Sequence, residues 1–161
     1  MVGPPSQVLT GPVAARDRYV LVSVWRVGAP LADVWSVFEQ LVDAPDPFAW
    51  WPDLEVRSRS EDALHVVTRS RLGYRLRFRL HALRTEPPHT ITVESTGDLN
   101  GAGRIVLTSD PGGGTRVHID WTVTVNRPWM RWTRPVLRPV FVASHRYVMR
   151  RGERALRAWV A

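Results

Sequence analysis

The sequence contains no cysteine and no lysine, and what it lacks narrows the kind of protein it can encode. Without cysteine, disulfides and thiolate metal sites are excluded, while a reducing compartment is permitted. No apolar run reaches the roughly 18 residues that a membrane-spanning helix needs. The first 18 residues also lack the basic start and apolar middle of a secretory signal. We therefore expect a chain that is neither exported nor inserted into a membrane, and the cytoplasm is the expected compartment.

The charge is strongly positive, and all of it comes from arginine. The 22 arginines give a formal net charge of +7, with an isoelectric point near 11.2. Such a balance ordinarily indicates nucleic acid or an anionic membrane as a partner. However, the arginines accompany 13 prolines and 8 tryptophans, a composition typical of coding in a GC-rich genome. We therefore expect no specific nucleic-acid partner.

The N-terminal part of the chain changes character near residue 17. Residues 1–16 hold proline, glycine and small residues without periodicity, which predicts a flexible leader. The rest, residues 17–161, has the length of one domain with a real core. This domain is expected to open with a strand at residues 18–27, which are rich in β-branched and aromatic side chains.

A helical period follows the first strand. From Pro30 onward, apolar residues recur at helical spacing through Leu41, and proline suits a first turn, so a short helix is predicted. The next stretch, "DAPDPFAWWPDL", is too rich in proline for a long element. It predicts a turn or a single helical turn that carries Trp50 and Trp51, which would be the second of two small helical segments.

Between Leu54 and Asn126 the sequence predicts six antiparallel strands, separated by glycine, proline and charged breakers. They span residues 54–60, 63–70, 74–86, 89–95, 103–109 and 115–125. The glycine runs "GDLNGAG" (97–103) and "DPGGG" (110–114) are interpreted as turns. Because both runs join strands and do not precede helices, neither is expected to bind phosphate.

Two of these strands show a strict alternation of side chains. In "YRLRFRLHALR" (74–84), the apolar residues from Tyr74 to Leu80 share one face, while three arginines and His81 share the other. The strand at 115–125 repeats the pattern, with Trp121 on its apolar face. An antiparallel sheet with one solvated face has this pattern, so the arginines are expected to face water.

The helical period returns after Asn126. Apolar and small residues form one stripe, which runs from Val140 or Phe141 through Ser144, Val148, Gly152 and Leu156 to Trp159. Pro135 and Pro139 are expected to break its first part. The prediction is a short segment near 128–134 and then a helix of about 20 residues, roughly 30 Å long.

The predicted order is strand, two small helices, six antiparallel strands and a long helix. It indicates an α+β helix-grip fold, in which a strongly curved sheet of about seven strands wraps around the C-terminal helix. Residues 18–157 resemble the polyketide cyclase/dehydrase-like branch of the START and Bet v 1-like superfamily (SRPBCC). The resemblance is carried by six segments in the right order: "VGAPLADVW" (27–35), "WWP" (50–52), "YRLRF" (74–78), "GDLNGAGR" (97–104), "GGGTRVHIDWTV" (112–123) and "RPVFVASHRYVMRRG" (138–152).

What the resemblance implies is a pocket for a lipophilic small molecule, with no cofactor, between the concave face of the sheet and the last helix. The ligand would be a polyketide, lipid, quinone or isoprenoid. The residues expected to line the pocket are Trp51, Tyr74, Leu76, Phe78, Ile91, Val93, Ile105, Leu107, Trp121, Phe141, His145 and Met149. The alternative is that these side chains simply fill a core.

Catalysis has few candidates in this sequence. The polar residues expected to face inward are Ser23, Tyr74, Ser95 and His145, and His145 is the best candidate for an acid or base. The alternative is a histidine that bonds to backbone or meets solvent at the pocket mouth. Related sequences tend to have asparagine where this chain has Ser144. This difference weakens the inference that Ser144 and His145 have the polar role that the resemblance would give to this pair of positions. The five histidines lack metal-ligand spacing, so no metal site is expected.

Three functions follow from these features. The first is binding of a hydrophobic ligand without catalysis, favoured by the apolar lining. The second is a cyclase or dehydratase acting on such a ligand. The third is a peripheral membrane lipid-transfer protein in transient contact with the membrane, since residues 127–139 mix cations and tryptophans as interfacial segments do. The prolines of that segment argue against a continuous amphipathic helix.

Overall fold

The computed structural model describes residues 18–70, 73–126, 132 and 134–161. The predicted leader, residues 1–16, lies outside the described residues. So does the predicted short segment near 128–134, apart from Trp132 and Arg134.

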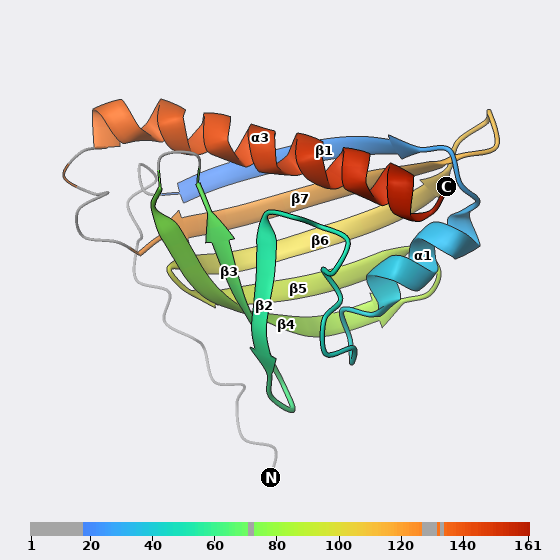
Figure 1. Ribbon diagram of the computed structural model, residues 1–161, viewed down its shortest axis with the longest axis horizontal. Coiled ribbons are helices and arrows are strands. Elements are labelled where there is room, and N and C mark those ends of the chain that lie inside the picture. Colours follow the sequence, from blue (N-terminus) through green and yellow to red (C-terminus); the bar gives the residue numbers. More distant parts are fainter. Residues whose placement is uncertain (1–17, 71–72, 127–131, 133) are drawn as a thin grey trace, which may run out of the picture.

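Seven strands form one antiparallel sheet in the order β1-β7-β6-β5-β4-β3-β2. The strands are β1 (Arg18–Val27), β2 (Leu54–Arg59), β3 (Leu64–Arg69), β4 (Arg75–Glu86), β5 (Thr90–Gly97), β6 (Leu99–Ser109) and β7 (Thr115–Val125). The helices are α1 (Leu31–Glu39) and α3 (Arg134–Trp159). Figure 1 shows α3 running along β1, while the sheet curves so strongly that β2 and β3 cross the direction of β5 and β6 in this view. The predicted α+β fold, a curved sheet with a long C-terminal helix, is confirmed.

Helix α1 covers one end of the sheet. Its apolar residues Val34, Trp35 and Phe38 are buried, as their helical spacing predicts. The chain that follows forms turns and not a second small helix. The Arg59 side chain of β2 holds this segment, because its guanidinium donates to the carbonyls of Leu41 (2.9 Å) and Ala44 (2.5 Å).

The turn predicted at residues 97–103 is present but much shorter than expected. Strand β5 continues to Gly97 and β6 begins at Leu99, so the chain reverses at Asp98. Gly101 and Gly103 are therefore strand residues. A Cβ atom at Gly101 would lie 1.9 Å from the carbonyl oxygen of Thr122 in β7. Glycine is needed here because β6 and β7 approach too closely for a side chain, and not because the backbone turns.

Helix α3 is longer and more continuous than predicted. It spans 26 residues and contains Pro139, so the expected break there is wrong. Pro139 has no backbone N–H, so the helix lacks one hydrogen bond at this position. Because Pro139 lies close to the start of the described helix, where the first backbone N–H groups have no helical acceptor in any case, the loss is tolerated. Leu156, on the predicted apolar stripe, is fully buried. Trp159 is expected on the same stripe, but it is 58% exposed. Trp159 is the last residue of the helix, and Leu156 and Val160 already meet the core at this end.

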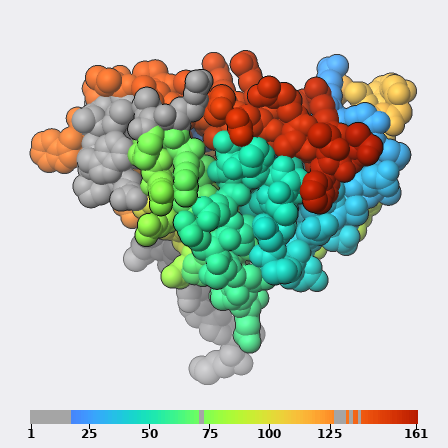
Figure 2. Space-filling model, in the orientation of Figure 1, coloured from blue at the N-terminus to red at the C-terminus, as the bar shows by residue number. Residues whose placement is uncertain are grey.

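The alternation predicted for the strands is present. In β4, Leu76 and Phe78 are buried while Arg75, Arg77 and Arg79 are exposed. Figure 2 shows how α3, β2, the turns before β2 and α1 pack side by side and close the interior on this face of the molecule. The apolar side chains are thus enclosed between the concave face of the sheet and α3.

Candidate functional site

A cavity of about 140 Å³ lies between the concave face of the sheet and α3. Its wall is formed by β3–β7 on one side, by α3 on the other and by α1 with the following turns at one end. The volume is close to the ~150 Å³ of an apolar cavity that stays dry and binds benzene. The space therefore suits one or two aromatic rings, and a third ring would extend beyond it.

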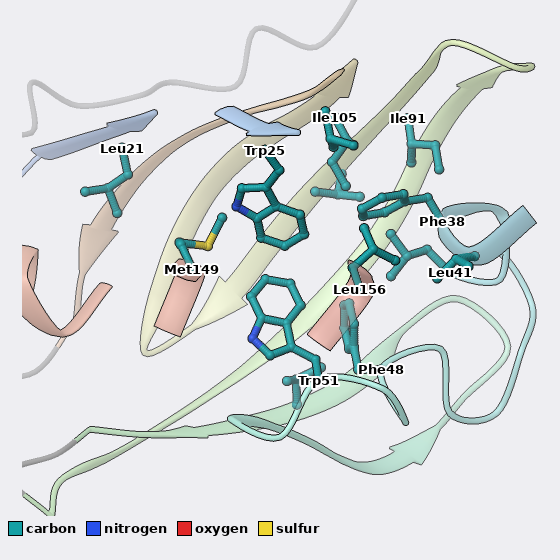
Figure 3. Packing of buried hydrophobic residues seen from close by; sticks show 14 of the residues in the cluster. Leu21, Trp25, Phe38, Leu41, Phe48, Trp51, Ile91, Ile105, Met149 and Leu156 are labelled. Carbon is teal, nitrogen blue, oxygen red and sulfur yellow. The ribbon is translucent and has the colours of Figure 1, made fainter. Parts of the chain in front are cut away.

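Ten of the twelve residues predicted to line a pocket border this cavity. They are Trp51, Tyr74, Leu76, Phe78, Val93, Ile105, Trp121, Phe141, His145 and Met149. The other two, Ile91 and Leu107, are fully buried but lie elsewhere in the core. Figure 3 shows Ile91 close to Phe38 of α1. Alternation identifies the inward face of a strand, but it does not show how far along the strand the cavity extends.

The cavity also has lining residues that the sequence analysis did not name as such. These are Phe38, Leu41, Phe48, Leu54, Thr68, Arg69, Ser70, Leu80, Leu99, Gly103, Arg104, Ile119, Asp120, Ser144 and Val148. The alternation in β4 and β7 could have identified Leu80 and Ile119, which continue the inward rows. No sequence signal identifies Phe38 or Phe48, because their position depends on how α1 and the turns pack over the sheet.

Trp51 forms the wall where the "WWP" turn meets α3. Its indole Nε1 donates to the carbonyl of Val148 at 3.2 Å, and its ring stacks on Trp50 with centroids 5.2 Å apart. The ring occupies space that a side chain at position 152 would need, because a Cβ atom at Gly152 would lie 2.5 Å from the Trp51 Cε2 atom. Figure 3 shows Trp51 facing Trp25 of β1 across the core. Glycine on α3 thus makes room for the aromatic wall.

An ion pair joins the same turn to α3 on the outside. The Arg151 Nε atom donates to an Asp53 carboxylate oxygen at 2.8 Å, and its guanidinium also contacts the Tyr147 hydroxyl at 3.2 Å. The two hydrogen bonds and the Asp53 charge raise the pKa of Arg151. The turn that carries Asp53 and the part of α3 that carries Arg151 lie 98 positions apart in the chain. They are therefore connected through both an apolar and a polar contact.

His145 projects from α3 toward the cavity between Phe141 and Met149, one helical turn on either side. Its ring lies 6.5 Å from the Trp121 ring, centroid to centroid. Burial lowers the pKa of His145 from 6.5 to about 4, so the imidazole is neutral at pH 7. A neutral imidazole offers one N–H donor and one nitrogen acceptor. Within the described part of the chain, neither ring nitrogen has a hydrogen-bond partner.

Glu153, the nearest acidic residue after His145 on α3, has other partners. Its carboxylate accepts from the backbone N–H of Arg26 at 3.0 Å and from the Arg157 guanidinium at 2.7 Å. Among the described residues, no acidic side chain forms a hydrogen bond or an ion pair with His145. The arrangement therefore lacks the partner that usually orients a catalytic imidazole.

The other polar side chains predicted to face inward divide into two groups. Tyr74 borders the cavity, whereas Ser23 and Ser95 do not. Ser95 is 1% exposed, and its hydroxyl has no described hydrogen-bond partner. Thr68 borders the cavity but donates its hydroxyl to the carbonyl of Asp53 at 3.1 Å.

Three charged residues border the cavity, and all three direct their side chains away from it. Arg69, Arg104 and Asp120 alternate with inward residues of β3, β6 and β7. The Arg69 side chain is 58% exposed and pairs with Glu55, while the Asp120 side chain is 48% exposed and contacts His118. The interior of the cavity is therefore apolar, with His145 as its main polar group.

No group of three or more potential metal ligands occurs in the ranges that the structure describes. His81, His89 and His118 bond instead to Asp62, Leu107 and Asp120. None of the described helices is long and apolar enough to cross a membrane. Of residues 127–139, the structure describes Trp132 and 134–139, and Trp132 is 88% exposed.

The comparisons with known proteins agree with this architecture. The family described as polyketide cyclase / dehydrase and lipid transport matches residues 27–144. The aromatase/cyclase Zhui from a Streptomyces species has a similar structure, with a TM-score of 0.69 and 11% identity over 89% of this chain and 93% of that one. A START superfamily protein from Mycobacterium smegmatis has a TM-score of 0.64 and 16% identity over 88% of this chain and 96% of that one.

A third similar structure is the di-domain aromatase/cyclase BexL, with a TM-score of 0.64 and 18% identity over 89% of this chain and 50% of that one. At these identities the likeness shows the shared fold. No curated protein matches the chain significantly.

Proposed function

Because the chain belongs to the polyketide cyclase/dehydrase and lipid transport family, we propose that it binds a hydrophobic small molecule in the cavity between the sheet and α3. The ligand would be of polyketide, lipid, quinone or isoprenoid type. The observation that carries the proposal is a cavity of about 140 Å³ whose wall is made almost entirely of apolar side chains. Ligand sites of small molecules commonly combine such a lining with a few polar groups.

The expected driving force is burial of apolar surface. A ligand that loses about 200 Å² of apolar surface to the cavity gains about 5 kcal/mol at 25 cal/mol per Å². Part of this gain is offset by the loss of translational and rotational freedom. A gain of about 5 kcal/mol corresponds by itself to a Kd of about 0.2 mM, so a compact aromatic molecule should bind no more tightly than this. A larger ligand buries more surface, but it would have to displace lining side chains or extend outside.

A fluorescence titration with N-phenylnaphthylamine, a neutral probe of low polarity, tests the proposal. Ser144 borders the cavity from α3, while Ala143, the residue before it, is exposed. We expect Ser144→Trp to fill the cavity and weaken probe binding by at least about tenfold, because the probe loses its space. The matched Ala143→Trp variant should bind like the wild type. Equal binding by all three proteins would contradict the proposal.

The second candidate is an enzyme, a cyclase or dehydratase, that acts on such a ligand. It is favoured by the neutral imidazole of His145, which faces the cavity and could accept a proton. His145→Gln keeps a hydrogen-bonding group but removes the titratable ring. If this variant binds ligand normally while a demonstrated reaction slows by a factor of about 100 or more, the enzyme is the better account.

A further inference from the structure

The cavity has no charged group in position to receive a ligand charge, among the residues that the structure describes. The charged side chains at its border, Arg69, Arg104 and Asp120, belong to strand positions on the outer face of the sheet. Arg69 and Asp120 already have partners of opposite charge in Glu55 and His118. An ion inside the cavity would therefore lose its water without gaining a counter-charge.

The polar groups at the wall are unequal in what they can offer a ligand. The Thr68 hydroxyl is occupied by the carbonyl of Asp53, and both Ser70 and Tyr74 already have interactions. Trp51 donates its indole N–H to Val148. His145 and Ser144 differ from these residues, because both border the cavity while neither has a hydrogen-bond partner among the described residues. Of the two, the imidazole of His145 is the longer side chain and offers both a donor and an acceptor on separate atoms.

We propose that the cavity selects uncharged ligands, and that the single hydrogen-bonding group of the ligand, a hydroxyl or a carbonyl, contacts the imidazole of His145. This inference rests on the proposed function and specifies its ligand class. A hydroxyl fits best, because it can donate to the ring nitrogen that lacks hydrogen and can equally accept from the ring N–H. A carbonyl can use the N–H alone.

The cost of placing an ion in this cavity supports the charge selection. Burying an unpaired carboxylate or ammonium is strongly unfavourable, and an ionisable group in such a place usually becomes neutral. His145 shows this effect on the protein itself, because burial lowers its pKa to about 4 and keeps it uncharged at neutral pH. A ligand in the same space would experience the same loss of hydration.

A matched ligand series separates the two parts of the proposal. The four compounds of the series share the naphthalene ring system. Naphthalene is neutral and apolar, and naphthalenemethanol is neutral and polar. Naphthoate is an anion, and naphthylmethylamine is a cation. Displacement of N-phenylnaphthylamine at pH 7 gives their relative affinities. We expect naphthalenemethanol to bind at least about tenfold more tightly than naphthoate or the amine. It should also bind about fivefold more tightly than naphthalene, the value of one net hydrogen bond.

Variants of His145 assign the polar contact. His145→Leu should abolish the preference for the alcohol over naphthalene, while His145→Gln should retain most of it. The surface variant His118→Gln is the control and should leave the preference unchanged, because the His118 side chain is 43% exposed and its ring bonds to Asp120 on the outer face.

Each outcome of this experiment decides a separate point. Binding of naphthoate within a factor of two of the alcohol would overturn the charge selection while leaving the proposed function intact. Persistence of the alcohol preference in His145→Leu would overturn the role of His145. If none of the four compounds displaces the probe, the proposed function itself fails.

Discussion

Replacement of Gly152 by alanine tests how tightly α3 is packed against the aromatic wall of the cavity. The new Cβ atom would lie 2.5 Å from Cε2, 2.6 Å from Cζ2 and 2.9 Å from Nε1 of Trp51. Ordinary contacts of a Cβ atom begin near 3.4 Å. The Trp51 ring would have to move by roughly 1 Å, yet it is buried, stacked on Trp50 and bonded to the carbonyl of Val148.

Two opposing effects decide the sign of the change. Alanine in place of glycine stabilises a helix interior by about 1 kcal/mol. Overpacking in a dense core costs about 1–3 kcal/mol, and loss of the Trp51 hydrogen bond costs about 1 kcal/mol more. We therefore expect Gly152→Ala to lower the free energy of unfolding by about 1–3 kcal/mol. Each kcal/mol corresponds to a fall in Tm of about 2–4 °C for a chain of this size.

Urea denaturation followed by circular dichroism measures the effect. The same substitution in a Trp51→Leu background removes the obstructing ring, so alanine should there stabilise the protein by up to about 1 kcal/mol. Ala143→Gly, on the exposed face of α3, reports the helix propensity alone and should cost about 1 kcal/mol. If Gly152→Ala stabilised the wild type as much as the Trp51→Leu protein, the packing described for Trp51 would be wrong.

Three further predictions follow from other parts of the molecule. Because the pKa of His145 lies at about 4 in the folded protein and near 6.5 in the unfolded chain, the unfolded chain takes up a proton first as the pH falls. The wild type should therefore lose about 2–3 kcal/mol of stability relative to His145→Gln between pH 7 and pH 4.5, and parallel urea midpoints across this window would contradict the buried imidazole. Gly101→Ala should prevent normal folding, seen as loss of soluble protein or a broad thermal transition, because its Cβ atom meets a backbone oxygen at 1.9 Å, whereas Gly112→Ala, in open space, should fold normally. The exposed arginines of β4 should support DNA or RNA binding in an electrophoretic shift assay at low salt only, and tight, sequence-selective binding near physiological salt would refute their interpretation as a solvated face.

Much of this fold can be predicted from the sequence because its strands alternate so regularly. Leu76 and Phe78 are separated by arginines that could not be buried without partners, so the inward face of β4 is determined locally. The same argument places Trp121 on the inward face of β7. These local patterns are sufficient to predict a curved sheet with one apolar face and to identify most of the cavity wall on the strands.

Features that depend on distant contacts could not be predicted in the same way. Glycine at 101 is compatible with a turn or a strand, and only the close approach of Thr122 decides between them. The place of Pro139 inside α3 depends on where the helix begins, which the local sequence leaves open. Phe38 and Phe48 border the cavity because α1 and its following turns pack over one end of the sheet. No periodicity in the sequence encodes that placement.

Intermolecular nuclear Overhauser effects between bound naphthalenemethanol and methyl-labelled protein test the central claim most directly. A ligand in the cavity should show contacts to the methyl groups of Leu76, Val93 and Ile105, which all border it. The exposed side chains Val20 and Val22 on the outside of β1 should show none. Saturable binding with contacts to these outer valines, and none to the three inward residues, would contradict a ligand site between the sheet and α3.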